Sequence, residues 1–163
     1  MNFQEHPARQ WNRKASTVAV LLLSVVIAAC ETTGSGALGG SAESRAERAV
    51  LNGEYQEAAG LYIGLAAEAS GGERDRLTLL AVDNWLDAGD VVRAENAFSG
   101  VAQPQGGELL WRWNSTRSAM LLYKGEAELA RDMLESLSRQ SLPPELRLRV
   151  EALRADAWFQ LQE

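Results

Sequence analysis

The feature that most constrains this chain is a glycine turn that recurs at a fixed interval. Gly53, Gly89 and Gly125 are each 36 residues apart. An alanine follows each glycine after five residues, and a large apolar residue follows after nine. These equivalent residues are Ala58, Ala94 and Ala130, and then Tyr62, Phe98 and Leu134. A fixed period of this length predicts an array of repeated supersecondary units.

The segments between the turns have the spacing of helices. Their apolar residues recur at intervals of three and four, and no window alternates in the manner of a strand. Asp90 is a candidate N-cap, and Gly89 suits the left-handed position that ends a helix. We expect helices at about 41–51, 55–69, 73–88, 91–101, 107–124, 127–139 and 144–161. Since one helix pair cannot bury its apolar face alone, residues 41–163 are predicted to form an all-α solenoid of stacked helical hairpins.

Residues 1–29 have the pattern of an export signal. Arg9, Arg13 and Lys14 precede the uncharged run 15–29. This run is shorter than the roughly 20 apolar residues of a membrane-spanning helix and is typical of the central region of a signal peptide. The alternative is an uncleaved anchor in which the following cysteine is incidental.

The signal ends at a cysteine. Ile27-Ala28-Ala29-Cys30 resembles the bacterial lipobox, which implies diacylglyceryl attachment to Cys30, cleavage before it and acylation of the new N-terminus. Two or three acyl chains anchor a protein stably in a membrane. By resemblance to enterobacterial lipoproteins, Glu31 in place of an aspartate implies transfer to the outer membrane. Cys30 is the only cysteine, so no internal disulfide can form.

Residues 30–40 are predicted to be the lipidated cysteine and a flexible linker, because glycine, serine, threonine and alanine dominate them. Residues 34–39 match the pattern G-x-G-x-x-G of dinucleotide-binding sites. That site requires a buried strand before the first glycine, whereas here a cleavage site precedes it. The match is therefore rejected.

The composition argues against several kinds of chemistry. His6, within the signal, is the only histidine, so the mature chain has no Ser-His or Cys-His pair and no usual zinc ligand set. Removing residues 1–29 changes the formal charge from −6 to −8, which opposes binding to nucleic acid. We expect no cofactor, no metal and no enzymatic activity. A catalytic carboxylate pair stays open, but a solvated acidic surface is favoured.

One local cluster is a candidate contact surface. Trp113 is one period after Leu77 and is expected in the core, whereas Trp111 is one period after Asp75 and is expected outside it. A tryptophan beside an arginine often anchors a protein interface, so Trp111 and Arg112 are a possible partner contact. The alternative is that they pack between units or against a further domain.

The repeats resemble known families. The glycine turn, the alanine five residues later and the aromatic residue nine later resemble the second half of a tetratricopeptide (TPR) repeat, lengthened from its usual 34 residues. Residues 76–82, 88–90 and 94–98 are similar to the N-terminal domain of the LpoA family. Those proteins are outer-membrane lipoproteins that activate class A penicillin-binding proteins, the peptidoglycan synthases.

The resemblance to the LpoA family implies a function, and it implies that the chain as given lacks a further domain. It implies a lipoprotein, anchored at the periplasmic face of the outer membrane, that regulates peptidoglycan synthesis by activating a class A penicillin-binding protein. The family has a second, α/β domain to which its synthase contact is attributed, and we expect the chain as given, which ends at Glu163, to lack it. The alternative is another TPR lipoprotein that serves outer-membrane protein assembly or pilus biogenesis. A hydrolase or transglycosylase is disfavoured by the missing histidine and free cysteine.

Overall fold

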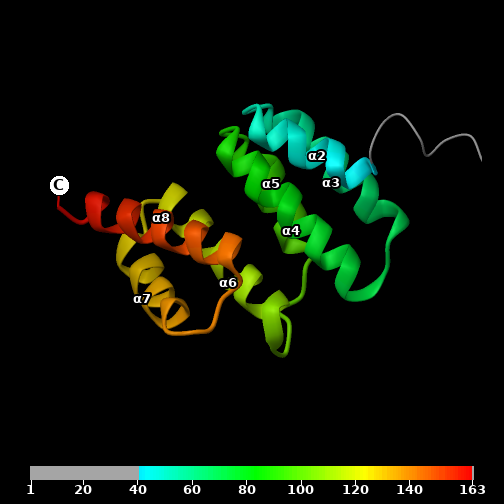
Figure 1. Cartoon of the computed structure of the whole chain (residues 1–163). Helices are drawn as coiled ribbons and strands as arrows, with labels where there is room; N and C mark the ends of the chain where they lie inside the picture. Colours follow the sequence, from blue (N-terminus) through cyan, green and yellow to red (C-terminus); the bar gives the residue numbers. More distant parts are fainter. Residues whose placement is uncertain (1–40, 163) are drawn as a thin grey trace, which may run out of the picture. The chain divides into compact units, whose positions relative to one another are not determined.

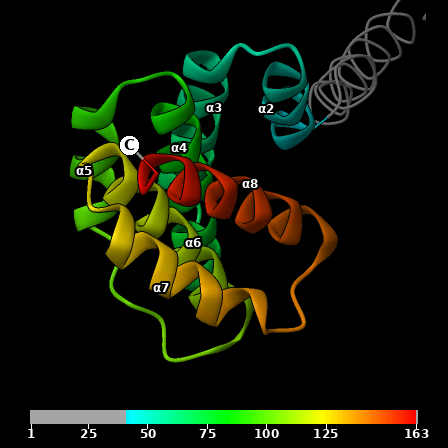
Figure 2. The same ribbon diagram turned by 90° about the vertical axis from the view of Figure 1, so that its left-hand side faces the viewer.

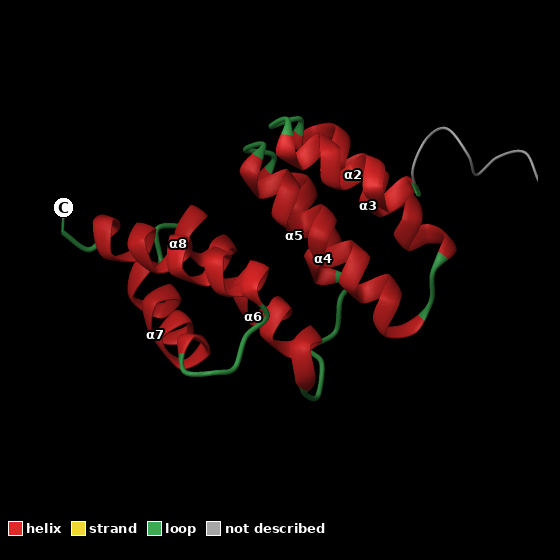
Figure 3. Ribbon diagram, in the orientation of Figure 1, coloured by secondary structure: helices red, strands yellow, loops and turns green. Residues whose placement is uncertain are grey.

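The structure is a computed structural model that describes residues 41–162 (Figure 1). Within that range the chain forms seven helices and no strand, so the prediction of an all-α chain is confirmed there (Figure 3). The helices are α2 (Ala42–Leu51), α3 (Tyr55–Glu68), α4 (Gly71–Asp87), α5 (Val91–Ser99), α6 (Gly107–Tyr123), α7 (Ala127–Ser138) and α8 (Pro144–Gln160). Each predicted helix boundary lies within two residues of the observed one. The predictions for residues 1–40, including lipidation of Cys30, lie outside the described residues.

The three periodic glycines form the same turn. Gly53, Gly89 and Gly125 have φ angles of +78°, +76° and +74°, in the left-handed region that favours glycine. At the second turn, the amide of Gly89 donates to the carbonyl of Leu86 at 2.9 Å, and the amide of Asp90 donates to that of Trp85 at 2.8 Å. Equivalent bonds occur at the other two turns. This pair of bonds defines a Schellman motif, which ends α2, α4 and α6.

Two more glycines divide the period in half. Gly71 and Gly107, at the beginnings of α4 and α6, have φ angles of +60° and +71°. Left-handed glycines therefore occur every 18 residues from Gly53 to Gly125. Pro143 occupies the next such position with φ −54° and leads directly into α8, where a proline is tolerated in the first turn.

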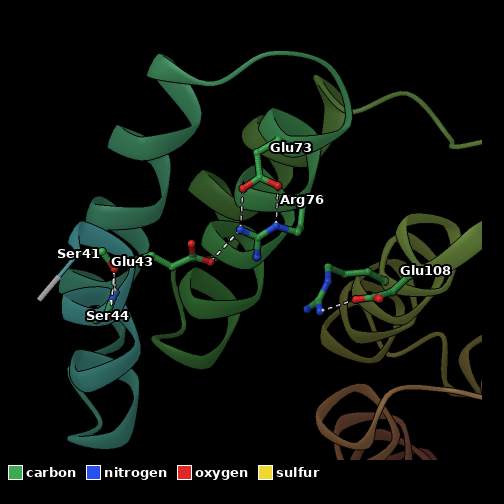
Figure 4. Close-up of polar contacts among 7 residues, drawn as sticks. Ser41, Glu43, Ser44, Glu73, Arg76 and Glu108 are labelled. Atoms are coloured by element: carbon green, nitrogen blue, oxygen red, sulfur yellow. Dashed lines mark hydrogen bonds and ion pairs between the residues drawn. The ribbon is translucent and has the colours of Figure 1, made fainter.

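Helices that are equivalent in the period pack against one another. α4 contacts α6, and α6 contacts α8, while α3, α5 and α7 pack against these helices (Figures 1 and 2). α2 is joined to α4 by an ion pair between Glu43 and Arg76 at 2.7 Å. Figure 4 shows Glu43 and Glu73 approaching the guanidinium of Arg76 from two sides. The chain thus repeats its contacts as well as its turns.

Small and large residues alternate in the core as the period predicts. Ala58, Ala94 and Ala130 are all fully buried, which lets neighbouring helices approach closely. Tyr62 and Leu134, nine residues after their glycines, are buried as well. Trp113 is buried against Phe98, with ring centres 5.2 Å apart, so its predicted core position is confirmed.

The apolar pattern continues into α8 at an exposed position. Leu86 and Leu122 are buried at equivalent places in α4 and α6, with 0% and 4% of their surface exposed. Trp158 follows them by the same period but is 46% exposed, and the guanidinium of Arg131 lies 5.7 Å from its ring centre. α8 therefore presents an apolar surface that its counterparts bury.

We predict that Gly89→Ala lowers the free energy of unfolding by about 1–2 kcal/mol, because a Cβ in the left-handed region is strained even where space is open. No atom lies within 4 Å of the added methyl group, so steric contact adds nothing. Gly64→Ala is the matched control, since Gly64 lies inside α3 and a methyl group there also meets nothing. The free energy of unfolding of that control should rise by about 0.5–1 kcal/mol. Denaturant titration of both variants measures the difference, and equal effects would contradict the role assigned to Gly89.

Candidate functional site

A groove of about 480 Å³ is lined by residues of α2, α3, α4, α6 and α8. We call it the central groove. Its apolar and aromatic lining residues are Val50, Leu51, Tyr62, Leu80 and Leu146. Its charged and amide lining residues are Glu47, Asp83, Asn84, Asp87, Arg112, Glu145 and Arg149. The groove is the candidate functional site because it joins apolar surface, buried charge and residues from five helices.

A buried ion pair lies at the inner side of the groove. The side chain of Asp83 is only 6% exposed, and its Oδ1 lies 2.9 Å from a terminal nitrogen of Arg149. The hydroxyl of Thr116 donates to the same oxygen at 2.8 Å. Arg149 also pairs with Asp87 at 3.5 Å. These contacts join α4, α6 and α8. They also give the Asp83 carboxylate the counter-charge and the hydrogen bond without which its burial would be costly.

Burial affects the pKa values of the Asp83 carboxyl and the Arg149 guanidinium. Removal from water raises the pKa of the Asp83 carboxyl above its ordinary value of 3.8, although Arg149 and the hydrogen bond from Thr116 oppose the rise. Burial tends to lower the pKa of Arg149, but Asp83 and Asp87 outweigh it and the pKa is raised. The guanidinium therefore stays charged, so the charge of the Asp83–Arg149 pair changes with pH through the Asp83 carboxyl.

Asn84 leaves one acceptor unused at the groove. The residue is 5% exposed, and its Nδ2 donates to the carbonyl of Leu80 at 2.8 Å. Its Oδ1 is buried and has no hydrogen-bond partner among the described residues. A buried polar atom without a partner is energetically unfavourable, so the Asn84 side chain is only partly satisfied where α4 lines the groove.

Two carboxylates at the edge of the groove make no ion pair with another described residue. Glu47 and Glu145 are exposed and lie on α2 and α8. Burial raises the pKa of the Tyr62 hydroxyl, and the negative charge of Glu47 raises it further, so Tyr62 stays neutral. The two arginines of the groove are already engaged, Arg149 as above and Arg112 with Glu108 at 3.5 Å. The unbalanced charge of the groove is therefore negative.

The structure corrects part of the predicted contact surface. Arg112 is only 8% exposed and lines the central groove, because α6 packs between α4 and α8. Trp111 is half-buried and packs against the core formed by α6, α7 and α8. It lines a separate hollow of about 340 Å³ between α6 and α7. The expected exposed Trp–Arg pair is therefore not present, and a partner contact at Trp111 stays a prediction.

The sequence analysis missed Asp83, Thr116 and Arg149. A signal for Arg149 was available, because Leu77 and Trp113 occupy its equivalent positions in the period and are core residues. A charged residue in a core register requires a buried partner of opposite charge. No such signal identified Asp83 as that partner, since the pairing depends on how α4 and α8 pack.

Neither a metal-holding cluster nor a membrane span is found among the described residues. No group of three or more histidine, cysteine or acidic side chains within residues 41–162 is placed to hold a metal ion. No helix in the same range has both the length and the hydropathy of a membrane span. The central groove in this part of the chain combines apolar lining residues with an acidic edge.

No protein-family model matches the chain, and neither a curated protein nor a solved structure is significantly similar to it.

We predict that Arg149→Met lowers the free energy of unfolding by about 3 kcal/mol at neutral pH, because the buried Asp83 carboxylate loses its counter-charge. The loss should shrink as the pH falls. Arg149 is the strongest influence that holds the pKa of Asp83 down, so its removal raises the folded-state pKa of Asp83 further. As the pH falls, the folded variant takes up a proton before the folded wild-type protein does, and the difference in stability narrows until Asp83 is protonated in both.

Denaturant unfolding of the two proteins between neutral and acidic pH tests this prediction. The control is Arg45→Met on the exposed surface of α2, which should change stability by less than about 0.5 kcal/mol. A loss that is the same at all pH values would contradict the role of Asp83.

Proposed function

We propose that this chain is a lipid-anchored, TPR-like scaffold of the outer membrane that regulates peptidoglycan synthesis by activating a class A penicillin-binding protein. The observation that carries the proposal is the repetition of one Schellman turn every 36 residues. Stacked helical hairpins of this kind present extended surfaces for protein contacts. The resemblance of residues 76–98 to the LpoA family supplies the partner.

The scaffold role is non-enzymatic. Four of the six charged groups of the central groove are engaged in ion pairs, and its most buried carboxylate is held by Arg149 and Thr116. The groove's free carboxylates, Glu47 and Glu145, lie at its exposed edge and not in a desolvated pocket where general acid–base catalysis is favoured. Activation of the synthase would then occur through binding, which shifts the partner toward its active conformation.

The anchor predicts where the protein is found. In Cys30→Ser, no thiol is available for the diacylglyceryl group, so the protein should no longer be labelled by a radioactive fatty acid and should leave the outer-membrane fraction. Ser35→Ala, in the same predicted linker, is the control and should be labelled as before. Labelling that persists in Cys30→Ser would exclude the proposed lipid site.

The proposed partner can be tested by a binding measurement and by an activity measurement. The protein expressed from its complete reading frame should capture a class A penicillin-binding protein of the same cell in an equilibrium pull-down, and should raise its rate of glycan polymerisation. Binding to none of the class A synthases would contradict the proposal. Capture of an outer-membrane assembly or pilus component in their place would favour the alternative scaffold role.

A further inference from the structure

The central groove exposes apolar surface. Val50 and Leu80 are half-buried in its lining, and Leu51 stands beside them with 85% of its surface exposed. Burial of such apolar surface by a partner is favourable. Leu146 also lines the groove but is only 2% exposed, and the unpartnered Oδ1 of Asn84 has almost no accessible surface. Apolar contact with Val50, Leu51 and Leu80 is therefore the first requirement for an occupant.

The charge of the groove gives the second requirement. Arg149 is committed to Asp83 and Asp87, and Arg112 lies close to Glu108. Glu47 and Glu145, from helices α2 and α8, are the carboxylates of the groove left without an ion pair among the described residues. An occupant that places a cation beside either carboxylate gains electrostatic attraction from it.

These two requirements exclude several occupants. Nucleic acid and anionic lipid would meet the carboxylates of the groove with like charge. An acidic peptide would be repelled in the same way. An amphipathic segment with leucine-like residues on one face and arginine or lysine beside them matches both the apolar lining and the acidic edge.

We infer that the central groove binds a basic, amphipathic helical segment of a protein partner, with its apolar face on Val50, Leu51 and Leu80 and its cations toward Glu47 and Glu145. The inference rests on the proposed scaffold function, because that function is the reason for taking the occupant to be a segment of a protein. It assigns the contact to the helical array itself, whereas the family resemblance attributes the synthase contact to a second domain.

The test uses the full-length lipidated chain in a non-ionic detergent and a fluorescent helical probe peptide made of leucine, alanine and arginine. Fluorescence anisotropy, corrected with a detergent-only blank, should show saturable binding. A peptide with every arginine replaced by glutamate should not bind, and neither should one with every leucine replaced by serine. Equal binding of the charge-reversed peptide would overturn the inference.

Matched variants locate the site. Leu51→Ser should weaken binding about tenfold, because the leucine loses its burial against the peptide. Leu148→Ser is its control, since Leu148 is 74% exposed on α8 and does not line the groove. Glu47→Gln and Glu145→Gln should each weaken binding about two- to fivefold, whereas Glu68→Gln on the exposed surface of α3 should have no effect.

These results separate the inference from the proposed function. The groove assignment is overturned if the basic peptide fails to bind, or if Leu51→Ser and Leu148→Ser weaken peptide binding equally. Either result overturns it even if a synthase is captured in the pull-down. Selective loss in Leu51→Ser supports the groove assignment even if no synthase is captured, and then the proposed partner alone is wrong.

Discussion

The left-handed glycine turn is the constraint on which the rest of the helical array depends. At Gly53, Gly89 and Gly125 the same two backbone hydrogen bonds close the end of one helix and direct the chain into the next. Because the turns are alike and equally spaced, α4, α6 and α8 follow one another in order, with α4 packed against α6 and α6 against α8. The buried alanines five residues later, including Ala94, are the packing consequence of that regularity.

The ion pair of Asp83 and Arg149 does not follow the 36-residue repeat. Its partners come from α4 and α8, and Thr116 of α6 donates to the same carboxylate. Three helices that are equivalent in the period are thus joined by residues that are not equivalent. A buried pair of this kind contributes little net stability compared with apolar packing, but separating its partners is costly. We propose that it fixes the packing of these helices and so the width of the central groove.

The helices could be predicted from the sequence, whereas the site could not. Glycine turns and apolar spacing are local properties, so α2 to α8 and the burial of Trp113 were predictable. The burial of Arg112 could not be predicted from local spacing, because it depends on α4 and α8, which are distant in sequence. The groove depends in the same way on five helices coming together. Arg149 was the one residue of the site that the period itself marked, since it replaces Leu77 and Trp113 in a core register.

Site-specific photo-crosslinking in intact cells tests whether the helical array docks a protein partner through its central groove. A photoreactive amino acid would replace Leu51 at the edge of the groove or, as the comparison, Leu129 on α7, since both leucines are exposed and Leu129 lies outside the groove. We expect a crosslink to a class A penicillin-binding protein from position 51 and none from position 129. A crosslink from position 129 alone, or none from either position, would contradict docking through the groove.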